Sequence, residues 1–277
     1  MKRHIALLIL FTAFWAPAAK GQEVLTMEGT FRQGGLVVGR TDPRAAVEFE
    51  GRKVRVSPDG VFLIGFGRDA KPVATLKVRL PDGHEEVQRI DVGQREYDIQ
   101  RIDGLPPKKV TPPPEVLEQL KEERRKTAAA RKIDLPQTWF LDQWIWPAEG
   151  RISGVYGSQR ILNGKPRNPH SGVDIAAPEG TPIVAPANGK IVLAEPDMYY
   201  NGNMVFIDHG HGFKTAYLHM SRIDVKVGQF VRRGETIGAI GATGRVTGPH
   251  LHWMAYLFNT RLDPAFLVPE RPGIAAK

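Results

Sequence analysis

Short runs of β-forming residues separated by turn residues fill most of this sequence, and they restrict the chain to a mostly β fold. Two of the runs, residues 53–56 and 75–80, alternate polar and apolar side chains, as half-buried antiparallel strands do. Turn sequences such as Pro58-Asp59-Gly60 and Pro81-Asp82-Gly83 lie between the runs. We therefore expect a small β-sandwich of about seven short strands over residues 24–103.

A second β-rich stretch runs from residue 150 to 268. Glycine or proline is found at nearly every junction between its short apolar runs, for example beside residues 189–193. No helical period is present, so this pattern predicts an antiparallel sheet or barrel. An aromatic segment precedes this stretch, and we expect it to pack at the edge of a C-terminal domain that spans residues 135–270; its members are Trp139, Phe140, Trp144 and Trp146.

Residues 104–134 differ in composition from both β-rich stretches. Prolines are dense in 105–107 and 111–114, which predicts a stiff, extended linker. Residues 115–133 predict a single helix with few apolar positions among many charged ones. Charge this dense is typical of a solvated helix face, so we expect the helix to pack one stripe against a domain and to set the spacing.

The first 21 residues predict a secretory signal peptide. Lys2 and Arg3 precede an apolar run from Ile5 to Trp15, and small residues suitable for cleavage follow. The run is too short for a spanning helix, which needs about 20 apolar residues, so no stable membrane span is expected. The chain has no cysteine, and its formal net charge of +8 is not accompanied by a nucleic-acid-binding motif. We expect an exported protein of the periplasm or cell envelope, without disulfides or a nucleic-acid partner.

Four histidines and one aspartate carry the chemistry. His250 and His252 lie two residues apart on an extended segment, so their side chains point to the same side. His170 and Asp174 form a second motif upstream, and His219 lies between the two. His170, Asp174 and His252 supply three N/O ligands for one catalytic zinc ion with an open fourth position. His219 and His250 then remain to manage protons.

Each of these motifs is weak alone. A His-x-His pair occurs on surface strands without a metal, and His170 with Asp174 could form a hydrogen-bonded turn. The conjunction of three motifs within one β-rich domain favours a metal site. The remaining histidines have simpler interpretations: we expect His209 and His211 to be structural or exposed, and His84 to lie in a solvated loop.

Residues from about 154 to 267 resemble the lysostaphin/LytM-type zinc metallopeptidases of family M23. The resemblance implies that His170, Asp174 and His252 hold zinc and that His219 and His250 are catalytic. It also implies that the substrate is a peptide of bacterial peptidoglycan, either a crosslink or a stem peptide. The matching motifs, in family order, are Val155–Arg160, His170–Pro178, Gly180-Thr181-Pro182, Asp208-His209-Gly210, Tyr217–Ser221, Val227-Gly228-Gln229, Gly241–Gly244 and Gly248–His252.

The chain departs from this pattern in places. Many relatives have Phe-Glu where this sequence has Trp253-Met254; these positions are not ligands, so only the packing behind the site must differ. The loop between residues 157 and 170 varies among relatives and is expected to govern access and substrate choice. Arg160 in this loop either contacts substrate or braces the mouth of the site through a salt bridge.

Two other functions fit parts of the sequence. Some relatives lose ligands and instead activate cell-wall amidases or bind divisome partners, but all five site positions are filled here, which favours catalysis. A lipoyl- or biotinyl-carrier domain would present a modifiable lysine at a hairpin tip, and Lys190 lacks that setting. The N-terminal β-domain could bind a regulatory partner, bind the wall or shield the site, and the sequence leaves these open.

Overall fold

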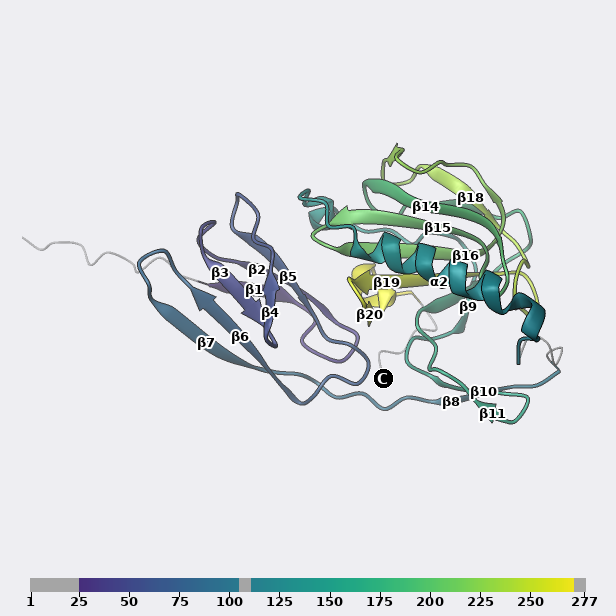
Figure 1. The fold of residues 1–277 in the computed structure, drawn as a ribbon, viewed down its shortest axis with the longest axis horizontal. Coiled ribbons are helices and arrows are strands. Elements are labelled where there is room, and N and C mark those ends of the chain that lie inside the picture. The colour runs from purple at the N-terminus through teal and green to yellow at the C-terminus, as the bar shows by residue number, and fades with distance from the viewer. Residues whose placement is uncertain (1–24, 105–110, 272–277) are drawn as a thin grey trace, which may run out of the picture.

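A computed structural model describes residues 25–104 and 111–271. The predicted signal peptide, residues 1–21, and the first prolines of the linker lie outside the described residues. The described chain is mostly β, as predicted, with a smaller and a larger β body side by side and one long helix on the larger body (Figure 1). No helix among the described residues is both long and apolar enough to cross a membrane.

Two sheets face each other in the smaller body. One has the order β1-β2-β5 and the other β4-β3-β6-β7. The core shared between them contains Val37 and Phe62 from the first sheet and Leu76 and Val78 from the second. Each of these four residues is fully buried. The strands are β1 (Thr26–Gly29), β2 (Leu36–Arg40), β3 (Ala46–Phe49), β4 (Arg52–Val54), β5 (Val61–Gly65), β6 (Val73–Arg79) and β7 (Glu85–Asp91).

Alternation along the strands explains why this body forms. In β6, residues Ala74, Leu76 and Val78 are buried while Lys77 and Arg79 are exposed, so one face joins the core and the other meets water. The sequence pattern of residues 75–80 predicted this arrangement.

Strand β8 (Ile99–Ile102) leaves the smaller body and joins the larger one. It pairs in parallel with β10 (Gln159–Leu162), which also pairs with β11 (Lys165–Pro166). The expected sandwich included residues 99–102, but these residues lie in neither of its sheets. They pair instead with β10, in the segment that precedes His170 and Asp174.

The larger body is built on a ten-stranded sheet with the main order β17-β14-β15-β16-β19-β12-β9. All pairings within it are antiparallel, as predicted. Its strands are β9 (Arg151–Gly154), β12 (Val173–Ala176), β13 (Pro182–Val184), β14 (Gly189–Met198), β15 (Gly202–Gly210), β16 (Phe213–Ile223), β17 (Phe230–Val231), β18 (Thr236–Ile240), β19 (His250–Leu257) and β20 (Thr260–Leu262).

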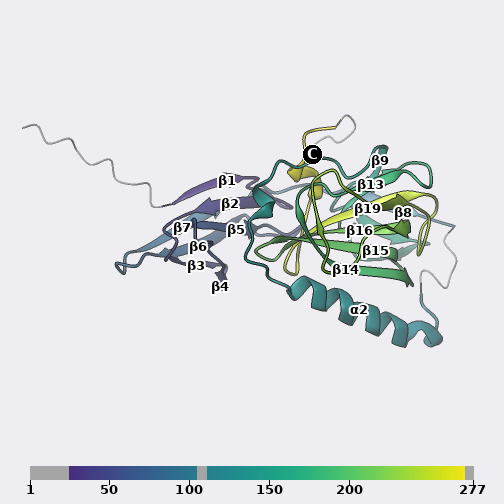
Figure 2. The same cartoon turned by 90° about the horizontal axis from the view of Figure 1, so that it is seen from above.

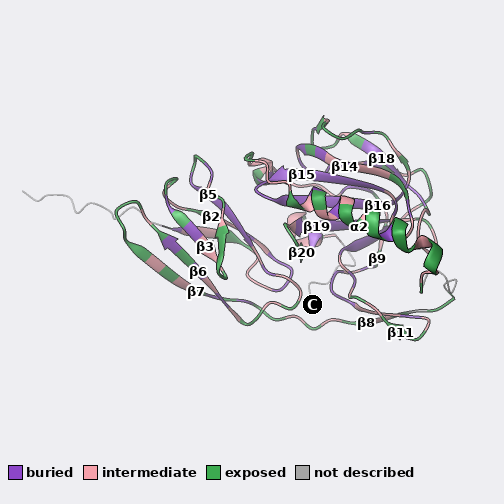
Figure 3. Cartoon of the chain, viewed as in Figure 1, coloured by how far each residue is buried: buried purple, intermediate pink, exposed green. Residues whose placement is uncertain are grey.

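Both faces of this sheet are covered. One face buries a core that includes Val205, Tyr217 and Trp253, and the other buries Phe206 and Leu218. Side chains alternate between the two faces of a strand, so a central strand that is buried on both faces has a continuous apolar run in its sequence. Figure 3 shows this as a largely buried sheet beneath a helix whose outer face is exposed.

Helix α2 (Leu117–Lys132), which follows a short 3-10 turn η1 (Pro114–Val116), packs on the second face. Its buried residues are Leu120, Thr127 and Ala130. Ala130 joins the same core as Phe206, and the Lys126 ammonium lies 2.7 Å from the Glu195 carboxylate of β14. In Figure 2, α2 lies on the outside of the large sheet, alongside β14.

The two bodies are joined by buried polar contacts as well as by the chain. Arg95, which follows β7, forms an ion pair of 2.8 Å with Asp263, and both side chains are less than 10% exposed. Asp263 caps the last 3-10 turn, η3 (Pro264–Leu267), by accepting from the Ala265 amide. The Tyr97 and Tyr156 rings also meet edge to face across this junction. Charged groups buried this deeply must stay paired, which holds the junction in one arrangement.

The aromatic segment before the larger body packs at its edge. It contains the 3-10 turn η2 (Trp139–Leu141), in which Phe140 is buried. The Trp144 ring lies 4.7 Å from the His209 ring, and the Trp146 ring lies 5.7 Å from that of Trp253.

Candidate metal centre and its groove

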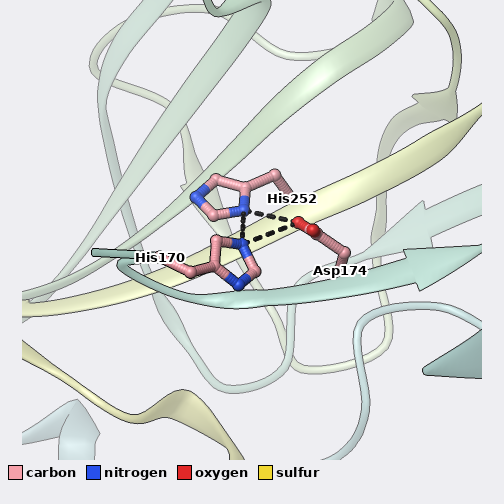
Figure 4. Close-up of side chains that lie close together, drawn as sticks. All are labelled: His170, Asp174 and His252. Carbon is pink, nitrogen blue, oxygen red and sulfur yellow. Dashed lines mark hydrogen bonds and ion pairs between the residues drawn. The ribbon is translucent and has the colours of Figure 1, made fainter. Parts of the chain in front are cut away.

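Two neighbouring strands bring the histidine–aspartate and His-x-His motifs together. β12 and β19 pair antiparallel, with Asp174 directly opposite His252. Residues directly opposite each other on paired strands have side chains on the same face, so the carboxylate and the imidazole project together. His170 lies in the loop before β12 and turns its ring onto the same point (Figure 4).

Three ligand atoms converge there. His170 Nε2 lies 3.0 Å from Asp174 Oδ1 and 2.9 Å from His252 Nδ1, and His252 Nδ1 lies 2.7 Å from Asp174 Oδ1. All three residues are buried, with at most 6% of each residue exposed. Among the described residues this is the group whose geometry could hold a metal ion.

The protonation of His170 makes this convergence informative. Its Nδ1 lies 2.9 Å from the Val155 carbonyl oxygen, and because a carbonyl only accepts, Nδ1 must carry the proton. In the neutral ring, Nε2 then carries a lone pair, and this lone pair faces the Asp174 carboxylate oxygen. Two electron-rich atoms at that separation need a cation between them, either a proton or a metal ion.

The electrostatics of the other two donors favour forms that bind metals. Burial would raise the pKa of the Asp174 carboxyl, but His170 and His252 hold it well below its usual range, so it is ionised. Burial lowers the pKa of His252 to about 4, against the opposing effect of Asp174, so the ring is neutral near pH 7. Neutral imidazole and carboxylate are the ligand forms that zinc requires.

The second carboxylate oxygen of Asp174 is held from outside the motif. Arg160 Nη2 donates to Asp174 Oδ2 at 3.1 Å, and Arg160 Nε donates to Gln100 Oε1 at 3.2 Å. Gln100 belongs to β8, so the strand that leaves the smaller body orients this carboxylate through Arg160. Of the two interpretations of Arg160 from sequence, the salt bridge is the one present in the structure.

Gly154, opposite Asp174 on β9, makes room for the carboxylate. A Cβ at residue 154 would lie 2.4 Å from Asp174 Oδ2 and 3.0 Å from His170 Cε1. Only glycine therefore fits against the carboxylate in this position.

His219 and His250 lie beside the three donors, with ring centroids 4.9 Å apart. His219 Nδ1 faces the Thr243 carbonyl oxygen and His250 Nδ1 faces the Gly248 carbonyl oxygen, each at 2.9 Å. By the same reasoning both Nδ1 atoms carry the proton, which leaves Nε2 of each ring as the acceptor. His250 Nε2 lies 3.9 Å from Asp174 Oδ1. Burial, with smaller effects of His252 and His250, lowers the pKa of His219 to about 3.

A groove of about 820 Å³ is lined by Asp174, His219, His250 and His252. Its floor is the apolar face of the large sheet, with Met204, Phe206 and Leu218, and its walls are rich in arginine. One wall is the helix α2, through Arg124, Thr127 and Arg131.

These wall residues were not predicted as site residues. The sequence places 124, 127 and 131 on one helix face by their spacing of three and four, but it does not tell which face meets the sheet. The expectation of a solvated charged face describes the opposite side of α2, where Arg125 pairs with Glu122 at 2.6 Å.

The other predicted histidines lie away from the donors. His209 is fully buried, with Nδ1 donating to the Asn188 carbonyl at 2.7 Å and Nε2 accepting from Thr215 Oγ1 at 2.8 Å. His211 is also buried, with its ring 5.2 Å from that of Phe140. His84 lies exposed in the turn before β7. Trp253 lies in the core behind the site, whereas Met254 faces the groove.

Comparisons with known proteins show which family the chain is similar to. Residues 168–264 match Peptidase family M23. A solved structure of a putative peptidase M23 from Pseudomonas aeruginosa is 33% identical, covers 86% of this chain and 95% of its own, and superposes with a TM-score of 0.67.

Two curated relatives from Vibrio cholerae are also similar. The peptidoglycan DD-endopeptidase ShyA is 52% identical over 104 residues, which are 37% of this chain and 24% of that protein. The peptidoglycan DD-endopeptidase ShyC is 49% identical over 130 residues, 46% of this chain and 30% of that protein. The chain thus spans less than a third of the length of these two relatives.

Proposed function

Because the chain belongs to peptidase family M23, we propose that it is a zinc-dependent endopeptidase that hydrolyses peptide bonds of bacterial peptidoglycan. The similarity to proteins named peptidoglycan DD-endopeptidases supports the substrate class. A substrate in the cell wall also requires export, in line with the predicted signal peptide and a location in the periplasm or cell envelope.

The observation that carries the proposal is the meeting of His170 Nε2, Asp174 Oδ1 and His252 Nδ1 at one buried point. One lone pair, one carboxylate oxygen and one neutral imidazole nitrogen make a donor set that fits a single zinc ion. A zinc ion held there supplies Lewis acidity, which makes water nucleophilic near neutral pH and polarises a carbonyl oxygen.

The protein's own groups provide the proton transfers. We assign to His250 the acceptance of the proton from the attacking water, because its Nε2 is an acceptor and lies 3.9 Å from Asp174 Oδ1, beside the three donors. His219 is the second proton carrier, on the other side of the scissile bond. Its ring is oriented by the Thr243 carbonyl and lies 4.9 Å from the His250 ring. The leaving amine takes its proton from one of these two rings.

Arg160 and Gln100 act on the metal ligand. Their hydrogen bonds hold Asp174 Oδ2, so that Oδ1 stays directed at the two imidazoles. We therefore regard them as positioning residues.

The test is to incubate the purified, zinc-loaded protein with peptidoglycan and to identify the released muropeptides by mass spectrometry. We expect cleavage products from the parent protein, and none after chelation or in His250→Ala. His84→Ala, which removes an exposed histidine far from the groove, serves as the matched control and should cleave like the parent.

A protein that binds zinc stoichiometrically but releases no fragment would contradict the proposal and favour the regulatory function that some relatives have. If His250→Ala cleaved like the parent, the proton role assigned to that residue would be wrong. Cleavage that survives complete removal of metal would exclude the zinc mechanism.

A further inference from the structure

His219 lies at a break in strand β16. Up to Leu218 this strand pairs with β19, and from Met220 onward it pairs with β18. On its other side, the pairing with β15 shifts between Asn203 and Val205, so that Leu218 and His219 lie opposite a single residue of β15. Two residues opposite one form a β-bulge, and a bulge beside an active site redirects a side chain.

The backbone of His219 is strained at this bulge. Its φ is +65°, a left-handed conformation that residues other than glycine rarely adopt. Its amide donates to the Asn201 carbonyl oxygen at 2.9 Å, just before the start of β15. A conformation of this kind persists only where the surrounding contacts hold it. The place of the imidazole in the groove therefore depends on the groups that hold this part of the backbone.

Thr243, in the loop between β18 and β19, holds both the backbone and the ring. Its hydroxyl donates to the Met220 carbonyl oxygen at 2.8 Å and accepts from the Asn203 amide at 3.1 Å, which ties the loop to both strands at the bulge. Its own carbonyl oxygen accepts from His219 Nδ1 at 2.9 Å. A single residue thus supports the chain beside His219 through its side chain and the imidazole through its main chain.

The loop that carries Thr243 lies directly against the two strands. Gly202 adopts a φ of +62°, and a Cβ at this residue would overlap the Thr243 hydroxyl. The ends of the loop are joined by the His250 amide, which donates to the Gly241 carbonyl oxygen at 3.1 Å. Within the loop, the Gly248 carbonyl oxygen accepts from His250 Nδ1. One anchored loop therefore orients both of the rings to which we assign proton transfer.

We infer that Thr243 is a positioning residue for catalysis: its hydroxyl anchors the loop, so that its carbonyl keeps the proton of His219 on Nδ1 and leaves Nε2 as the acceptor. Thr243 does not line the groove, so it acts through His219 and does not touch the substrate. The inference rests on the proposed function, since it matters for cleavage only if His219 carries a proton in the reaction.

The experiment compares Thr243→Val, which removes the hydroxyl and keeps the carbonyl, with Thr243→Ser, which keeps both. Thr181→Val is the matched control, because the Thr181 hydroxyl also donates to a carbonyl oxygen, that of Pro178 at 2.7 Å, but lies outside the groove. On the zinc-loaded full chain we measure kcat and KM with a soluble crosslinked muropeptide, zinc affinity and urea unfolding. Long-range proton–nitrogen NMR spectra of the labelled histidine rings report the tautomer of His219.

We expect Thr243→Val to lower kcat about tenfold, the effect of one hydrogen bond on a barrier, with KM and zinc affinity unchanged. The His219 ring should change from a single Nδ1-protonated tautomer in the parent to a mixture of two. Thr243→Ser should restore both kcat and the single tautomer, and Thr181→Val should match the parent. Thr243→Val should still fold, because the Met220 carbonyl oxygen also accepts from Asn203 Nδ2 at 3.0 Å.

An unchanged kcat in Thr243→Val would overturn the inference, as would a loss that Thr243→Ser does not recover or that Thr181→Val shares. A mixture of His219 tautomers in the parent would overturn it without any variant. If the parent cleaves nothing, the proposed function fails, and the NMR spectra still decide the role of Thr243: a tautomer that changes in Thr243→Val supports that role, and one that does not change refutes it.

Discussion

Gly154→Ala is the substitution that most directly tests whether Asp174 is a metal ligand. The new methyl carbon would lie 2.4 Å from Asp174 Oδ2, and real Cβ atoms essentially never approach a heavy atom more closely than 3.0 Å. The carboxylate must therefore retreat by at least the difference, 0.6 Å. Ligand distances in a zinc site vary by only about 0.2 Å, so this shift removes Asp174 from its position.

A shift of the backbone is not expected to remove this steric clash. Gly154 is paired with Asp174 on neighbouring strands, and Arg160 holds the same carboxylate oxygen, Oδ2, that the new methyl group would approach. We expect zinc affinity to fall about 10- to 100-fold, as for other losses of ligand orientation. The metal-free protein should lose only about 1–3 kcal/mol of unfolding free energy, the cost of overpacking.

The assay is a zinc titration against a chromophoric chelator, combined with urea unfolding of the metal-free protein. Gly67→Ala is the control, because a Cβ at residue 67 would meet only Thr260 Cγ2 at an ordinary 3.5 Å. A Gly154→Ala protein that binds zinc within about twofold of the parent would refute the assignment of Asp174.

Three further predictions follow from contacts around the centre and between the two bodies. Gln100→Ala removes the acceptor for Arg160 Nε, and we expect about fivefold weaker zinc binding with unchanged unfolding, since a single hydrogen bond is lost. Arg95→Met leaves the Asp263 carboxylate buried without its partner and should cost about 3–5 kcal/mol in urea unfolding, whereas Arg95→Met with Asp263→Leu should recover most of that loss. Burial lowers the pKa of His209 from 6.5 to about 4, so its neutral ring stabilises the fold above pH 6.5 and that contribution is lost as the pH falls toward 4. The stability difference between the parent and His209→Gln should therefore shrink by about 3 kcal/mol over that range, and a difference that does not change with pH would contradict the shift.

The mostly β class and the shared face of His250 and His252 were predictable from local pattern. Alternation along residues 75–80 and the two-residue spacing of His250 and His252 fix which side chains share a face, because strand geometry is local. The positions that the resemblance assigned to zinc, His170, Asp174 and His252, do lie together, and their roles stay predictions until metal is measured.

What the sequence did not predict depends on contacts between distant segments. The run Ile99-Gln100-Arg101-Ile102 is too short to identify its partner, and its parallel pairing with β10 joins residues about 60 positions apart. The role of Gln100 behind Arg160 follows from that pairing alone. The sequence also did not predict which face of α2 packs against the sheet, because a helix with few apolar residues has only a weak apolar stripe.

The route of the chain before residue 150 has a consequence for any shortened form of this protein. A chain that begins at residue 150 would keep the four histidines of the site and Asp174, yet it would lack Gln100, Arg124 and Arg131. Such a chain would keep the donors but lose the support that Gln100 gives to Asp174 through Arg160 and the wall that α2 contributes to the groove.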